Sequence, residues 1–116
     1  MAKSERTLSA FFSLVAIYAQ YTYIEVVKVV FDPKKNATNI RQHGVSLADG
    51  DGVLNDPLAL TIEDDVAEGE QRFVSMGANF FGTLMVVVYT YRNDEVRLIS
   101  VRKAEPKERR VYEKGI

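Results

Sequence analysis

Short runs of alternating hydrophobic and polar residues cover most of this chain, and they predict a sheet with helices around it. Residues 83–91 are almost continuously apolar, which favours a strand at the centre of the sheet. Residues 96–101 follow a turn of Arg92, Asn93 and Asp94, so the two segments predict a β-hairpin. Three further segments have the composition of strands: 21–31, 58–62 and 72–77.

Three helices are expected around these strands. Asp32 and Pro33 open the first, because Asp accepts hydrogen bonds from free amides and Pro is pre-set for the first turn. Gly44 ends this helix. Ser46 opens the second, which we expect to be short or frayed because it contains two glycines. The third is a mainly charged helix over residues 107–114. Together the elements predict an α+β fold, a small antiparallel sheet with helices packed on it.

Size and charge limit the class of protein. The chain has 116 residues and a hydrophobic content of 47%, which suits one domain with one core. Its formal net charge is -1, so it lacks the overall positive field of many nucleic-acid binders. The charge is nevertheless segregated, at -7 over residues 46–72 and +3 over residues 92–114. We therefore expect an acidic side and a basic side.

Cysteine and histidine are scarce. The chain has no cysteine, which excludes disulfides and thiolate catalysis, and its single histidine argues against an imidazole-based metal centre. The acidic run from Asp49 to Gly52 lacks the calcium-loop pattern. We therefore expect neither a metal site nor another cofactor.

The N-terminus contains an apolar run over residues 8–19. Lys3 and Arg6 precede it, and its length is that of a signal-peptide core, too short to span a bilayer. The cleavage signal is poor, because Ile17, two residues before Ala19, is not small. An amphipathic or buried helix and a mis-assigned start codon are favoured over export.

Two arginines in the predicted hairpin are candidates for anion binding. Arg97 and Arg102 keep their charge at any accessible pH and present planar donors that match a phosphate. An odd number of positions separates them, so an ideal strand would place them on opposite faces. A β-bulge, a twist or the strand end would have to re-aim Arg102. The alternative is a solvated hairpin whose charges discourage aggregation.

Short motifs with a consistent joint spacing extend over about eighty residues. They are Phe31-Asp32-Pro33, Lys35, Ala37, Asn39, Arg41, His43-Gly44-Val45, Asp56-Pro57, Glu70, Arg72, Gly77, Val86 to Thr90, Arg97 to Ala104, Glu108-Arg109 and Tyr112. Together they resemble the BrnT toxins of bacteria. The resemblance implies a RelE-like fold, an endoribonuclease activity in the cytoplasm, and neutralisation by a BrnA-like antitoxin. Such an antitoxin is a ribbon-helix-helix DNA-binding protein, so DNA would be contacted only through it.

The chain also departs from this family. Phe31 stands where the family usually has tryptophan, and the segment from Asp49 to Gly52 replaces one that is normally rich in Glu and Ala. The family begins close to Phe31. We therefore expect residues 1–22 to be an extension, helical or produced by a mis-assigned start, and residues 23–116 to be the BrnT-like domain.

RNA cleavage without a metal needs proton transfer from the ribose 2'-hydroxyl and stabilisation of the phosphorane. His43 is the candidate acid or base, because histidine is suited to proton transfer near neutral pH, although it could instead satisfy the last carbonyls of its helix. Arg97 and Arg102 are the candidates for stabilising the phosphate. Residues proposed to bind substrate are Arg72, Lys35 and Arg41. For these the alternatives are an ion pair of Arg72 with Glu70 and a solvated helix face.

Two other functions compete with the ribonuclease. The first is a catalytically inactive BrnT-like module that binds an antitoxin and contributes to operon repression. The second is an exported small domain. Toxicity to cells on induction would separate the enzyme from the inactive module, and the N-terminal mass of the mature protein would test export.

Overall fold

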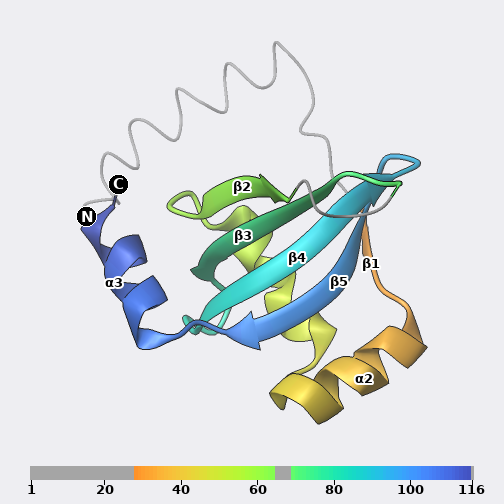
Figure 1. The fold of residues 1–116 in the computed structure, drawn as a ribbon, viewed down its shortest axis with the longest axis horizontal. Helices are drawn as coiled ribbons and strands as arrows, with labels where there is room; N and C mark the ends of the chain where they lie inside the picture. The colour runs from red at the N-terminus through yellow and green to blue at the C-terminus, as the bar shows by residue number, and fades with distance from the viewer. Residues whose placement is uncertain (1–27, 65–68, 116) are drawn as a thin grey trace, which may run out of the picture.

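A computed structural model of the chain describes residues 28–64 and 69–115, and they form an α+β fold (Figure 1). The elements in chain order are β1 (Lys28–Val30), α2 (Pro33–His43), η1 (Leu47–Asn55), β2 (Leu60–Asp64), β3 (Arg72–Ala78), β4 (Leu84–Arg92), β5 (Glu95–Lys103) and α3 (Pro106–Lys114). The described strands make one five-stranded sheet in the order β1-β5-β4-β3-β2, with β4 at its centre as predicted. All neighbours are antiparallel except β1, which pairs in parallel with β5.

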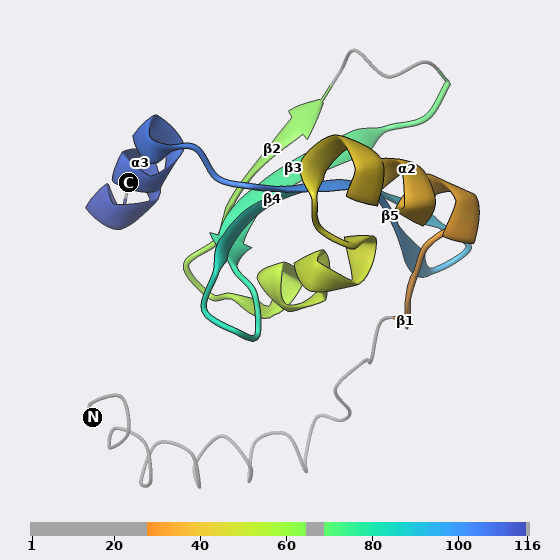
Figure 2. The same cartoon turned by 90° about the horizontal axis from the view of Figure 1, so that it is seen from below.

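The hydrophobic core lies between one face of the sheet and η1, which sits behind the strands in Figure 1 (Figures 1 and 2). Met85 and Val87 of β4 pack there with Leu98 of β5, and Leu47 and Val53 of η1 cover them. Val87 is fully buried, as expected for the central strand. We call the opposite side of the sheet the open face, because η1 does not cover it.

Helix α2 begins and ends as its sequence predicts. The Asp32 side chain accepts a hydrogen bond from the Lys34 amide at 3.0 Å, and Gly44 adopts a left-handed φ of 75° at the C-terminus. Asn39 then fixes the helix to the sheet: its side chain donates to the Val101 carbonyl at 2.8 Å and accepts from the Val101 amide at 3.0 Å. The asparagine amide thus replaces a neighbouring strand along β5, beyond the point where β1 ends.

The second helix, η1, is a 3-10 helix of nine residues that begins with the expected capping box of Ser46 and Asp49. Its glycines have a packing role. A Cβ atom on Gly50 would lie 2.7 Å from a methyl group of Val101 and 2.9 Å from one of Val87. Glycine therefore lets η1 lie directly against the core strands. The low helix propensity of glycine, which is what the sequence shows, does not indicate this packing role.

Two predicted strands differ from the observed ones. The strand expected over residues 58–62 is β2, Leu60–Asp64, and it is not half-buried, since the Ile62 side chain is 66% exposed. The reason is that β2 is an edge strand and Ile62 points to the open face. Of the strand expected over residues 21–31, only β1 is observed; residues 21–27 lie outside the described residues, as does the proposed extension over residues 1–22.

The helices among residues 28–64 and 69–115 are too short and too polar for any of them to cross a membrane.

Candidate active site

A β-bulge places Arg97 and Arg102 on the same face of the sheet. In the β4–β5 hairpin Val88 lies opposite Ser100, but the next residue, Tyr89, lies opposite Leu98, so Ile99 is an extra residue in β5. As a result Arg97 lies opposite Thr90 and Arg102 opposite Val86. These two β4 residues are four positions apart and share the open face.

Arg72 and Arg97 flank Thr90 on the open face. The register of β3 on β4 pairs Phe73 with Tyr89, so Arg72 lies beside Thr90 across one strand boundary, and Arg97 lies beside it across the other. Thr90 is only 2% exposed, and its hydroxyl donates to the Gln71 carbonyl at 2.7 Å. The Nε atoms of both arginines are buried, and neither has a hydrogen-bond partner within the described part of the chain. The two guanidinium groups thus retain unused donors at one end of this face.

A glutamate lies within the same group of arginines. One terminal nitrogen of Arg92 contacts both carboxylate oxygens of Glu70, at 2.7 Å and 3.2 Å. This hydrogen bond from Arg92, aided by the positive charges of Arg92, Arg72 and Arg97, lowers the pKa of Glu70 below its ordinary value despite some burial. Glu70 is therefore an ionised carboxylate beside the arginines with unused donors. We call Arg72, Arg97, Arg92 and Glu70 the arginine cluster.

Arg102 occupies a different position, at the other end of the open face. Its two terminal nitrogens bind the two oxygens of Glu108 in α3, at 2.8 Å and 2.7 Å. The hydrogen bond from Arg102 is the main reason why the pKa of Glu108 falls to about 2. The partners of Arg97 and Arg102 in β4, Thr90 and Val86, lie four positions apart, or about 13 Å along the strand. The structure therefore gives Arg102 a role in holding α3, and it does not bring it to the arginine cluster.

A second polar contact fixes α3. The Tyr112 hydroxyl donates to Oδ2 of Asp56 at 2.6 Å, and this hydrogen bond, with burial, raises the pKa of Tyr112 to about 12. Asp56 also accepts from the amides of Leu58 and Ala78. Burial acts to raise the pKa of Asp56, but these hydrogen bonds outweigh it and the pKa is lowered. Asp56 thus joins the loop before β2, the end of β3 and the C-terminal helix.

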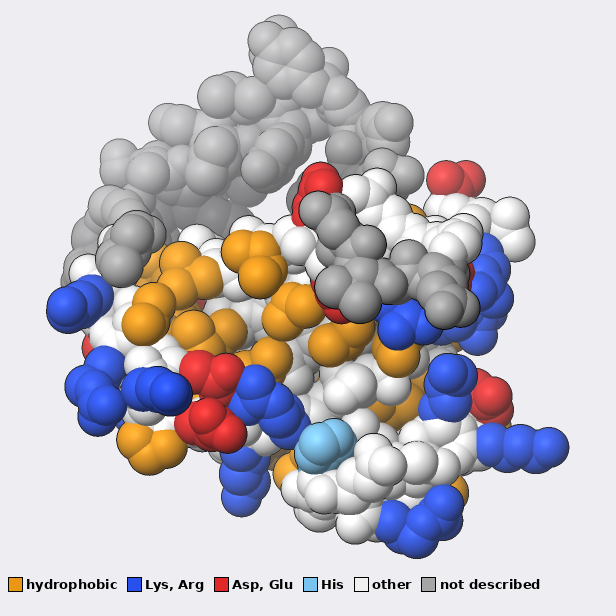
Figure 3. Space-filling view, in the orientation of Figure 1, with side chains coloured by type: hydrophobic (Ala, Val, Ile, Leu, Met, Phe, Trp, Pro, Cys, Tyr) orange, Lys and Arg blue, Asp and Glu red, His pale blue; other side chains and the backbone are white. Residues whose placement is uncertain are grey.

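The remaining candidates lie on α2. His43 is its last residue and is exposed, one turn beyond Asn39, which is bonded to β5 at Val101. His43 therefore lies nearer to Arg102 than to the arginine cluster, and Figure 3 shows the histidine side chain on the side of the open face. Lys35 and Arg41 are exposed on the same helix, and Arg41 donates to the Thr38 hydroxyl at 3.2 Å.

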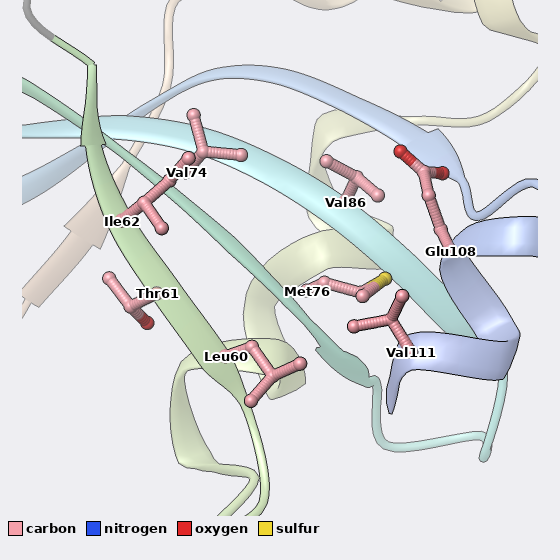
Figure 4. A pocket seen from close by; sticks show the side chains of 8 residues that line it. All are labelled: Leu60, Thr61, Ile62, Val74, Met76, Val86, Glu108 and Val111. Carbon is pink, nitrogen blue, oxygen red and sulfur yellow. The ribbon is translucent and has the colours of Figure 1, made fainter. Parts of the chain in front are cut away.

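An apolar groove of about 390 Å³ lies on the open face beside α3 (Figure 4). Its apolar lining comes from β2, β3, β4 and α3: Leu60, Ile62, Val74, Met76, Val86 and Val111. In Figure 4 these side chains converge on one space, and Glu108 stands at its rim. Figure 3 shows the corresponding hydrophobic patch beside α3.

Sequence reasoning did not assign two members of the arginine cluster. The sequence predicts Arg92 in the hairpin turn and Glu70 only as a partner of Arg72. The turn itself consists of Asn93 and Asp94, with φ of 53° and 66°, so Arg92 is still in β4 and faces the same way as Thr90. Strand alternation from Thr90 would have identified Arg92, but the contact of Glu70 with Arg92 is not local and left no signal in the sequence.

Within residues 28–64 and 69–115 no three His, Asp or Glu side chains gather in a way that could hold a metal ion.

The chain is similar to known proteins both in sequence and in fold. Residues 31–108 match the family of the ribonuclease toxin BrnT of type II toxin-antitoxin systems. The crystal structure of the Brucella abortus ribonuclease toxin BrnT has a similar fold, with a TM-score of 0.53 and 24% sequence identity over 69% of this chain and 99% of that one. No curated protein sequence shows significant similarity to the chain. Since the family match spans most of the described sheet and its helices, the chain belongs to the BrnT family of ribonuclease toxins of type II toxin-antitoxin systems.

Proposed function

We propose that this toxin cleaves RNA without a metal ion, and that Arg72 and Arg97 bind the phosphate that reacts. The observation that carries the proposal is the pair of buried Nε donors beside Thr90 that have no partner among the described residues. Buried donors are almost always satisfied, so a ligand that accepts hydrogen bonds fits this place. A phosphate accepts from guanidinium groups in their preferred planar geometry.

In the proposed reaction the ribose 2'-oxygen forms a bond to phosphorus while the bond from phosphorus to the 5'-oxygen breaks. One proton leaves the 2'-hydroxyl and one is delivered to the departing 5'-oxygen, so the products are a 2',3'-cyclic phosphate and a 5'-hydroxyl. Negative charge builds up on the non-bridging oxygens in the transition state. Two preorganised guanidinium groups would stabilise that charge.

Two groups are proposed for proton transfer: His43, which the sequence indicates, and Glu70, which lies beside the arginine cluster. His43 is exposed at the end of α2, where RNA on the open face would pass. Glu70 has the advantage of position, since it contacts Arg92 and lies near Arg72 and Arg97. Loss of His43 should reduce cleavage by about 10-fold to 100-fold if several groups share the proton transfer. A larger loss in Glu70→Gln than in His43→Ala would assign the base to Glu70.

Flanking phosphates are proposed to bind Lys35 and Arg41 on α2, and Arg102 where β5 ends. Each phosphate contact of this kind releases counterions, so its removal weakens binding. For single-stranded RNA it also reduces the slope of log K against log salt concentration by about 0.7. Lys35→Ala and Arg41→Ala should therefore raise KM with little change in kcat.

The proposed partner is a BrnA-like antitoxin with a ribbon-helix-helix fold, which holds the toxin inactive in the cytoplasm and mediates any contact with DNA. Membership of a type II toxin-antitoxin family supports a protein partner, and an open, arginine-rich face supports inhibition by direct coverage. Co-expression with the product of the neighbouring reading frame should yield a stable complex that no longer cleaves RNA. Co-purification of an unrelated fold would correct the identity of the partner.

The decisive experiment measures cleavage of a single-stranded RNA by purified Arg72→Ala and Arg97→Ala at equal folded fraction, in the presence of EDTA. Each variant should lose about 10²-fold to 10³-fold in rate, because each removes a donor to the transition-state charge. Arg110→Ala, an exposed residue of α3, is the matched control and should retain the wild-type rate. Abolition of wild-type cleavage by EDTA would refute the metal-independent reaction, and unchanged rates in both variants would refute the site. A wild-type protein that neither cleaves RNA nor harms cells would be the inactive binding module.

A further inference from the structure

The apolar groove on the open face has no use in the proposed RNA chemistry. Its lining offers methyl and thioether groups where RNA cleavage needs charge and hydrogen bonds. Two of the lining residues are far from buried, since Ile62 is 66% and Val111 43% exposed. Solvated apolar surface of this kind, held between a sheet and a helix, marks a place where another apolar group binds.

The chain itself contains an apolar segment without a counterpart in the family. The family match begins at residue 31, and the Brucella toxin aligns over nearly its whole length with only 69% of this chain. Residues 8–19 therefore lie outside the shared fold, although they are almost entirely apolar, with Phe11, Phe12, Leu14 and Val15 at their centre. Such a segment is costly to leave in water, so a hydrophobic surface within reach should bind it.

Distances along the chain allow this. Residues 20–27 connect the segment to β1, and eight residues span up to about 26 Å. The sheet from β1 to β2 is four strand spacings wide, about 19 Å, so the segment can reach either edge. As a helix, twelve residues are about 18 Å long, and β2, three of whose five residues line the groove, is about 17 Å long. The segment thus matches β2 in length and the groove in polarity.

We propose that residues 8–19 bind in the apolar groove of the same molecule, with the phenylalanine and leucine side chains between β2, β3 and α3. Attachment to the chain favours this occupant over a second copy, because a short connection gives the segment an effective concentration of about millimolar at the groove. The proposal does not depend on RNA cleavage. It concerns a different part of the open face, and each of the two can fail without the other.

Disulfide trapping in the full-length protein tests the proposal, and the absence of native cysteine makes the test clean. Leu14→Cys is combined with Ile62→Cys, and the exposed position of Ile62 makes that substitution compatible with the fold. Leu14→Cys with Lys35→Cys on the exposed surface of α2 is the matched control for random encounters.

Under mild oxidation the first pair should form an intramolecular disulfide about tenfold faster than the control, or more. Its product should migrate as a monomer and be linked between positions 14 and 62 by mass spectrometry. Disulfide-linked dimers would overturn the proposal in favour of a second copy. Equal rates for both pairs, or no disulfide at all, would overturn it by showing that the segment does not occupy the groove.

A dye that binds apolar surface gives an independent measurement on the full chain. Leu14→Asp should release the segment and raise dye fluorescence, whereas Glu5→Gln, outside the apolar run, should not. Unchanged fluorescence in Leu14→Asp would contradict the proposal. If wild-type protein already binds the dye strongly and the antitoxin suppresses that binding, the groove belongs to the antitoxin and the proposal is wrong.

Discussion

The four arginines on the open face differ in whether a carboxylate already engages them. Arg92 binds Glu70 and Arg102 binds Glu108, whereas Arg72 and Arg97 keep buried Nε donors without a partner among the described residues. An arginine in a good ion pair has few free donors for a ligand. Arg72 and Arg97 are therefore the better phosphate ligands, although the sequence makes Arg102 a candidate beside Arg97.

The role of Arg102 can be separated from the role of its ion pair. If Arg102 only holds α3, Arg102→Ala and Glu108→Gln should have the same small effects: a loss of stability of about 1 kcal/mol or less, since the pair is about a third exposed, and a similar RNA cleavage rate. If Arg102 binds RNA, only Arg102→Ala should reduce cleavage. Thermal unfolding and cleavage rates of the two variants give the answer.

The Arg102–Glu108 pair also predicts a pH dependence. The pKa of Glu108 is about 2 in the folded protein, below its ordinary 4.5, so ionised Glu108 favours folding. This contribution is fully present above about pH 4.5 and disappears as the pH falls toward 2. The difference in Tm between wild type and Glu108→Gln should therefore be largest near neutral pH and should vanish near pH 2. A difference independent of pH would contradict this account.

Among the elements, η1 is the one most constrained by packing. Gly50→Ala should destabilise the protein by about 1–3 kcal/mol, because its methyl group would meet Val87 and Val101 in a filled core. Chemical denaturation measures this loss. Ala48→Gly, at an exposed position of the same helix, is the control for helix propensity and should cost about 1 kcal/mol or less. An equal cost for both changes would mean that the core relaxes around the added methyl.

The elements that sequence predicted well are those fixed by neighbouring residues. Asp32 and Gly44 delimit α2 through contacts within one turn, and Ser46 does the same for η1. What sequence left undetermined depends on contacts between distant segments. The parallel pairing of β1 with β5, the Asn39 contact with Val101 and the Glu70–Arg92 pair each join residues far apart in the chain. No local pattern records them.

At the scale of the whole molecule, described residues of the acidic and basic segments contact each other and are not confined to two separate sides. Glu70 from the acidic segment binds Arg92 from the basic one, and Asp56 binds Tyr112 within the basic segment. Strand order explains the first contact, since Glu70 lies just before β3, Arg92 ends β4, and these two strands are neighbours. Opposite charges of the two segments therefore meet on the open face, where Glu70 binds Arg92.

Deletion of residues 2–20 should leave a folded domain. The core described here consists of residues from Val29 onward, and the family match begins at residue 31. The shortened protein should keep a cooperative thermal transition while its solubility falls, because the apolar groove would lose the segment proposed to fill it. Loss of the cooperative transition would show that the extension is integral to the fold.

The extra residue at Ile99 has a consequence for how these proteins diverge. With the bulge, two arginines five positions apart share a face; in a regular strand the same arrangement requires a separation of four. If a related protein lacks Ile99 and is otherwise unchanged, its two arginines should still share a face. The deletion removes the bulge and also shortens the separation of the arginines to four positions. Moving one of the arginines by a single position along β5 would instead place it on the opposite face, unless the bulge moved by the same amount. Comparison of related sequences should therefore reveal loss of the bulge residue as a tolerated single deletion in β5, although single length changes within a strand are usually disruptive.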